Sequence, residues 1–122
     1  MTVNDAIARA SLIVGGSVSR EMFSKWLTEI ELTVIIEVAI THRGGIYDIS
    51  DVDPNGDGNR VLWAPEPYSE LYVNYLVMKS DLFLRDLDQY VNSSRIFAAS
   101  YQAFTDWYNR TFMPVSETKI VL

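Results

Sequence analysis

Residues Ala64–Pro114 read APEPYSELYVNYLVMKSDLFLRDLDQYVNSSRIFAASYQAFTDWYNRTFMP. Pro65 and Pro67 favour an extended chain that runs into a first helical turn, and Ser69 with Glu70 completes a helix-start signal. Apolar and aromatic residues then recur at spacings of three and four, the period of a helix with one buried face: Leu71, Tyr72, Tyr75, Leu76, Leu82 and Phe83. We therefore predict a helix from about Glu70 onward.

A second aromatic stripe lies further along the same segment. It follows a polar stretch, Asp86 to Ser94, which we expect to be a short break between two antiparallel helices. Four rings then share one helical face, at spacings of four, three and four residues: Phe97, Tyr101, Phe104 and Tyr108. We expect Phe97, Tyr101 and Phe104 to be core residues that face Leu71, Tyr75 and Leu82 of the preceding helix.

The chain holds more aromatic residues than one helical seam needs. We expect core packing for most of them and a protein interface for the rest. They are Trp26, Tyr72, Tyr75, Tyr90, Phe97, Tyr101, Phe104, Trp107 and Tyr108.

Two helices are predicted upstream. Thr2 or Asn4 can cap the first, whose apolar residues recur near helical spacing until Gly15-Gly16: Val3, Ile7, Ala10, Ile13 and Val14. Ser19 or a neighbouring serine can cap a second helix of about twenty residues, which Gly44-Gly45 should end. Its stripe is Phe23, Trp26, Leu27, Ile30, Val34 and Val38. The β-branched run from Ile30 to Ile40 favours a strand in isolation, but the continuing stripe favours the helix.

These elements predict an all-α fold: a compact bundle of about four helices in one domain, residues 1–114. Residues 44–67 form a loop insertion after the second helix, in which Ile46–Ile49 and Arg60–Trp63 favour a small β-hairpin. Residues 115–122 lack a helical period and are expected to form an extended tail outside the bundle.

The composition argues against several classes of function. The 122 residues suit one domain, and 16 acidic against 10 basic side chains give a net charge of -6, which disfavours a broad nucleic-acid-binding surface. The absence of cysteine excludes disulfides and thiolate metal sites. We see no secretory signal and no apolar run of bilayer length, so no membrane association is expected.

The sharpest chemical motif resembles the first half of a calcium loop, with oxygen-bearing residues at alternate positions and Gly56 at the sixth. Those residues are Asp51, Asp53, Asn55 and Asp57. The twelfth position is Leu62 where a bidentate Glu is needed, so we interpret the loop as a solvated turn, with a weak calcium site as the alternative.

We assign no catalytic residues and no cofactor. His42 is the only histidine, and its place near a helix end favours a capping or interface role. No Gly-x-Ser-x-Gly sequence supports a nucleophile, and Asp81, Asp86 and Asp88 suit a solvated or intersubunit charged face.

The order and spacing of many ordinary residues carry a family resemblance over most of residues 20–114. They are Trp26-Leu27, Glu29, Glu37, Thr41-His42, Pro67-Tyr68, Glu70-Leu71-Tyr72, Tyr75-Leu76, Lys79, Asp81, Tyr90, Asn92-Ser93, Phe97, Tyr101, Phe104, Tyr108-Asn109-Arg110-Thr111 and Met113-Pro114. With these residues in this order, the chain resembles the head-to-tail connector (adaptor) proteins of long-tailed phages and prophages.

The resemblance implies a structural protein of the virion neck, assembled in the host cytoplasm, and no enzymatic reaction. Copies, usually twelve, would form a ring on the portal protein, pass DNA through the lumen without specific binding, and offer a docking surface to a stopper or tail-completion protein. It also implies a portal-binding C-terminal tail: Val115, Ser116, Glu117, Thr118, Lys119, Ile120, Val121 and Leu122. The alternative is a small soluble binding or regulatory module that uses an aromatic helix groove, with a calcium-responsive module third.

Overall fold

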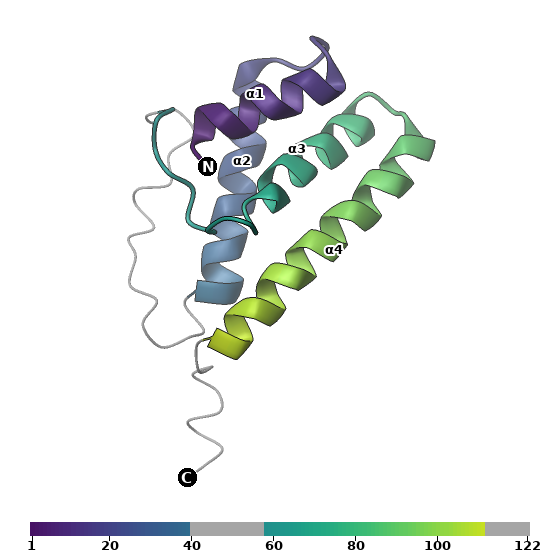
Figure 1. Ribbon diagram of the computed structural model, residues 1–122. Coiled ribbons are helices and arrows are strands. Elements are labelled where there is room, and N and C mark those ends of the chain that lie inside the picture. Colours follow the sequence, from purple (N-terminus) through teal and green to yellow (C-terminus); the bar gives the residue numbers. More distant parts are fainter. Residues whose placement is uncertain (40–57, 112–122) are drawn as a thin grey trace.

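The computed structural model describes residues 1–39 and 58–111. Within these ranges the chain forms four α-helices and no strand, which confirms the predicted all-α bundle (Figure 1). The helices are α1 (Val3–Val14), α2 (Arg20–Val34), α3 (Glu70–Phe83) and α4 (Leu87–Thr111), and a π-helical segment, η1 (Ile35–Ala39), extends α2. In the described part of the chain, no helix has the length and apolar character needed to cross a bilayer.

Local capping fixes where α1 and α2 begin. Of the two candidate caps for α1, the structure uses Thr2, whose hydroxyl accepts the Asp5 N–H at 3.1 Å while the Asp5 carboxylate accepts the Thr2 N–H at 3.2 Å. Gly15 closes this helix with φ 88°, a conformation that glycine adopts without strain. The Ser19 hydroxyl caps α2 by accepting the Met22 N–H at 3.2 Å. Both helix starts agree with the sequence prediction.

The β-branched run after Ile30 is helical as far as it is described. α2 passes into η1 and reaches Ala39. Val34, Ile35 and Val38 are buried, so the stripe begun by Phe23 continues through the change in helix type. The predicted stop at Gly44-Gly45 lies outside the described residues.

The break predicted from Asp86 to Ser94 is wrong in extent, because α4 already begins at Leu87. The Asp86 carboxylate accepts the Gln89 N–H at 3.3 Å, which provides a cap for α4. Most polar residues that follow lie on the exposed side of the first turns, and Ser93 and Ser94 bond to carbonyls within the helix. Polar residues on a solvent-facing side do not interrupt a helix.

The α3–α4 turn includes one residue in an unfavourable conformation. Arg85 has φ 58°, in the left-handed region where glycine is preferred. We expect Arg85→Gly to raise the free energy of unfolding by about 0.5 to 1 kcal/mol, measured by chemical denaturation. Arg95→Gly, which introduces glycine in the middle of the exposed side of α4, is the control and should lower stability by about 1 kcal/mol. A loss of stability in Arg85→Gly would contradict this account.

The core surrounds α3, which packs against α1, α2 and α4 and runs antiparallel to α4 (Figure 1). Leu71, Tyr72 and Leu76 are fully buried. Leu82 and Phe83, predicted on the same stripe, are 44% and 52% exposed, and Ile13 of α1 is 64% exposed. Ile13 and Leu82 are each the next-to-last residue of their helix. Phe83 is the last residue of α3, where fewer neighbours cover it.

The segment Gly58–Ala64 pairs with the N-terminus. The Val3 N–H donates to the Arg60 carbonyl at 3.0 Å, and the Leu62 N–H donates to the Met1 carbonyl at 2.9 Å. This antiparallel contact leaves Leu62 and Ala64 buried. The second piece of the predicted hairpin, Arg60–Trp63, thus has a partner at Met1–Val3, whereas the first piece, Ile46–Ile49, lies outside the described residues.

Candidate functional site: a buried carboxylate and an aromatic seam

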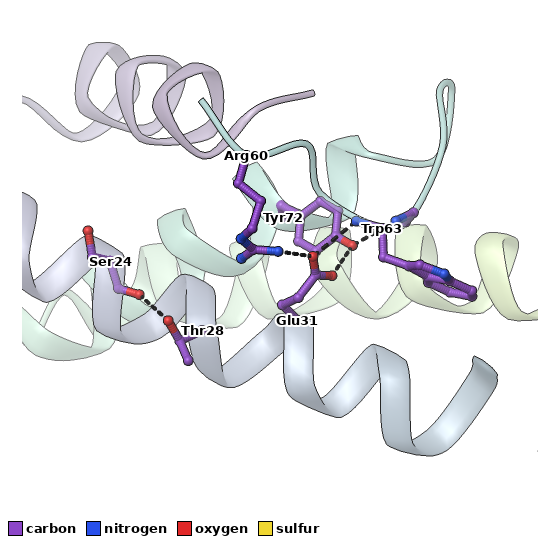
Figure 2. Close-up of polar contacts among 7 residues, drawn as sticks. Ser24, Thr28, Glu31, Arg60, Trp63 and Tyr72 are labelled. Carbon is purple, nitrogen blue, oxygen red and sulfur yellow. Dashed lines mark hydrogen bonds and ion pairs between the residues drawn. The ribbon is translucent and has the colours of Figure 1, made fainter. Parts of the chain in front are cut away.

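Glu31 is a fully buried carboxylate on α2 that faces Tyr72 and the segment with Arg60 and Trp63 (Figure 2). Its Oε1 accepts a hydrogen bond from the Tyr72 hydroxyl at 2.6 Å. Its Oε2 accepts from the Trp63 backbone N–H at 3.0 Å and from Arg60 Nη1 at 3.3 Å. The three donors come from α3 and from the segment that pairs with the N-terminus. One carboxylate therefore joins α2 to two other parts of the chain.

The position of Glu31 follows from the helical period of α2. It lies four residues after Leu27 and three before Val34, on the face that carries the apolar stripe. A carboxylate on such a face costs several kcal/mol to bury unless its oxygens are hydrogen-bonded. Here both oxygens are satisfied, so the network stabilises one specific placement of Arg60 and Trp63 against α2. This role was not predicted from the sequence, although a charged residue within an apolar stripe is a detectable signal.

The Tyr72 hydroxyl completes the network by also accepting the Ala64 N–H at 2.9 Å. Burial raises the pKa of Tyr72 well above its ordinary value of 10.0, and the negative charge of Glu31 raises it further. Tyr72 therefore keeps its proton at physiological pH and acts as a hydrogen-bond donor. This arrangement suits a structural role better than nucleophilic or base chemistry.

Two more tyrosine–glutamate pairs attach the outer part of the bundle to α2 and η1. The Tyr75 hydroxyl donates to Glu29 at 3.3 Å, and the Tyr101 hydroxyl donates to Glu37 at 2.5 Å. Partial burial, and to a lesser extent the charge of Glu29, raise the pKa of Tyr75 to about 12. Partial burial and the hydrogen bond to Glu37 raise the pKa of Tyr101. α3 and α4 thus each have a polar attachment to the second helix.

These raised pKa values predict alkaline instability. Above pH 10, unfolded tyrosines lose protons that the native Tyr72, Tyr75 and Tyr101 retain, so the unfolded state binds fewer protons and stability falls as pH rises. The tyrosine contribution should be fully present below pH 10 and lost as pH rises towards the native pKa values. Chemical denaturation between about pH 8 and pH 11 measures this. A constant free energy of unfolding across that range would contradict the prediction.

The last turns of α4 carry an aromatic cluster. Phe104 and Tyr108 are buried, and Trp63, Tyr68 and Trp107 are partly buried against them. Ring centroids are 5.0 Å apart for the stacked pair Tyr68 and Trp107, and 5.3 Å apart for Trp63 and Tyr108. This cluster lies beside Thr111, where the described part of α4 ends.

The structure brings the predicted aromatic residues together as follows. Trp26 and Tyr72 are buried, and Tyr75, Phe97 and Tyr101 are partly buried. Tyr75 contacts Phe97 with ring centroids 5.2 Å apart, so α3 and α4 do face each other through these rings. Of the other two predicted partners of the α4 stripe, Leu71 is fully buried and Leu82 is exposed.

Several predicted sites lie outside the described residues. These are the calcium-loop residues Asp51, Asp53, Asn55 and Asp57, the helix-end residue His42, and the tail Val115–Leu122. Within residues 1–39 and 58–111, no group of three or more His, Cys, Asp or Glu side chains is placed to hold a metal ion. An open crevice of about 220 Å³ is lined by Met1, Asp5, Ala8, Arg9 and Glu66.

Comparison of the chain with models of protein families, with curated proteins and with solved structures gave no match.

Proposed function

We propose that this chain is a structural protein of a phage neck, which forms a ring on the portal and connects the DNA-filled head to the tail or to the next neck component. The observation that carries the proposal is the ordered set of residues between Trp26 and Pro114 that resembles head-to-tail connectors. A mostly helical bundle whose described polar network holds the elements in place is compatible with a scaffold role.

Physical features support this assignment. A ring requires two different complementary faces on each subunit. α4 runs for 25 residues, and beyond its core face it leaves a long exposed side that includes Arg95, Gln102 and Asp106. The net charge of -6 suits a lumen through which DNA passes, because an attractive lining would retain the polymer.

The proposal assigns portal binding to the tail, Val115–Leu122. α4 carries the chain to Thr111, next to the aromatic cluster, and the tail follows within a few residues. Deleting Ser116–Leu122 is expected to abolish association with the portal while leaving the circular dichroism spectrum and the melting temperature of the isolated protein unchanged. The measurement is co-sedimentation of the full and shortened chains with purified portal.

The matched control replaces Ser116 and Thr118 with alanine, which keeps the tail length and its apolar residues. Undiminished portal binding by the shortened chain would contradict the assignment of portal binding to the tail. Native mass spectrometry of the full chain mixed with portal tests the ring itself, with twelve copies per portal expected.

A second candidate function is a binding module that uses the aromatic cluster. The observation that favours it is the incomplete burial of Trp63, Tyr68 and Trp107 at the end of α4. Failure of the full chain to bind portal, in the same mass measurement, would favour this alternative.

A further inference from the structure

Five large apolar residues at and next to the α3–α4 turn are about half exposed. We call them the tip patch. They are Leu82 (44% exposed), Phe83 (52%), Leu84 (43%), Leu87 (62%) and Val91 (49%). Single exposed apolar side chains are normal, whereas a group of neighbouring ones marks an interaction surface.

The tip patch lies on a well-formed turn. The Leu84 N–H donates to the Ser80 carbonyl at 2.8 Å, and the Asp86 N–H donates to the Asp81 carbonyl at 2.9 Å. From the other side, the Phe83 ring packs edge-on against Trp26 of α2, with centroids 5.8 Å apart. A surface that is already ordered loses little conformational entropy when a partner binds.

The spacing of the tip patch indicates the shape of its partner. Leu87 and Val91 are four residues apart on α4, so they form one strip along the first turns of that helix, and Leu84 precedes them in the turn. Strips with this spacing pack against the apolar side of another helix, as in helix pairs and coiled coils. A helix laid beside the start of α4 would cover the strip.

The charges around the tip patch indicate the chemistry of that partner. Within residues 81–91, the charged side chains are Asp81, Asp86, Asp88 and one cation, Arg85. Within residues 1–39 and 58–111, none of these four side chains takes part in an ion pair. The stretch 81–91 therefore carries a net charge of -2. A second copy of the chain, at a net charge of -6, would add like charges to the contact.

From these observations we infer that the tip patch is a docking site for an amphipathic helix of a partner protein, with an apolar side flanked by lysine or arginine residues. The apolar strip supplies the contact area, and the three aspartates select the basic flanks. This inference is independent of the proposed neck function.

The test uses the full chain and two labelled synthetic peptides of about 18 residues, each with leucines on one helical side. One peptide carries lysines on its flanks, and the other carries glutamates at the same positions. Fluorescence anisotropy should show binding of the lysine peptide only. Binding should weaken on addition of salt, because dissolved ions screen the carboxylates of half-buried Asp81 and exposed Asp88.

Three variants make the result specific. The double change Leu87→Ser with Val91→Ser should weaken binding of the lysine peptide about tenfold or more. Asp81→Asn with Asp88→Asn should weaken it and reduce its salt dependence, while Asp86 is left in place because it caps α4. Leu12→Ser is the matched control, since Leu12 is 87% exposed outside the tip patch, and it should bind as the unchanged chain does.

Equal binding by the double serine variant would overturn the inference, as would equal affinity for the glutamate peptide or no binding of either peptide. Sedimentation velocity of the full chain decides the remaining alternative. Self-association that disappears in the double serine variant would assign the tip patch to a second copy and overturn the heterologous partner. Circular dichroism establishes whether each variant is folded. If the Leu87→Ser, Val91→Ser variant unfolds, peptide binding by the Asp81→Asn, Asp88→Asn variant tests the inference.

Discussion

Replacing Phe104 with alanine is expected to lower the free energy of unfolding by about 3 to 5 kcal/mol. Phe104 is fully buried, and its ring centroid lies 5.7 Å from that of Trp63 and 6.0 Å from those of Tyr68 and Tyr108. These neighbours belong to α4 and to the segment before α3, so truncation leaves a cavity between two parts of the chain. Rings fixed on separate elements do not collapse fully into such a space. Urea denaturation measures the loss.

Phe83→Ala is the matched control for this prediction. Phe83 is 52% exposed and, among residues 1–39 and 58–111, its ring contacts only that of Trp26, so its truncation should cost less than about 1 kcal/mol. Both variants replace phenylalanine with alanine, so the difference between their losses of unfolding free energy reports the difference in burial. A loss below about 1 kcal/mol for Phe104→Ala would show that the aromatic cluster is not packed as described.

Replacing Tyr72 with phenylalanine is expected to lower the free energy of unfolding by about 2 to 3 kcal/mol. The substitution keeps the ring and removes only the hydroxyl, which donates to Glu31 at 2.6 Å and accepts from the Ala64 N–H at 2.9 Å. It leaves one oxygen of a buried carboxylate without its donor and one backbone N–H without its acceptor. The cost is that of two unsatisfied buried polar groups, so it exceeds that of an ordinary surface hydrogen bond.

Tyr75→Phe provides the comparison, because Tyr75 also donates to a glutamate but is only partly buried. Water can replace its hydroxyl at Glu29, so the loss should stay below about 1 kcal/mol. Thermal and urea denaturation of both variants measure the difference. Equal small losses in the two variants would mean that Glu31 does not depend on Tyr72 and that the buried network contributes little to stability.

Much of the helical architecture could be predicted from short stretches of sequence. Thr2 and Asp5 form a capping box, Ser19 caps α2, and Gly15 ends α1. Each feature involves residues within four positions of one another, so neighbouring residues alone decide the conformation. The apolar period likewise predicted the helix after Ile30 in spite of its β-branched residues.

Less of the candidate site could be predicted. The aromatic stripe of α4 was identified, but which rings are buried depends on what covers them, and Leu82 proved to be exposed. The polar residues after Asp86 do not reveal the start of α4, because most of them lie on the solvent side of the helix and buried Ser93 bonds to the Tyr90 carbonyl. The role of Glu31 was missed altogether. The acidic loop and the C-terminal tail lie outside the described residues and stay predictions.

The sequence by itself determined the four helices, the starts of α1 and α2 and the end of α1, since capping bonds and apolar periods act over one or two turns of chain. Only the tertiary structure decided which polar group is buried and which residues donate hydrogen bonds to it. The partners of Glu31 lie 29, 32 and 41 residues away, at Arg60, Trp63 and Tyr72. A pattern of neighbouring residues does not specify contacts at such separations. They form because packing α3 and the segment before it against α2 removes water from the carboxylate, and each of its oxygens must then find a donor within the protein.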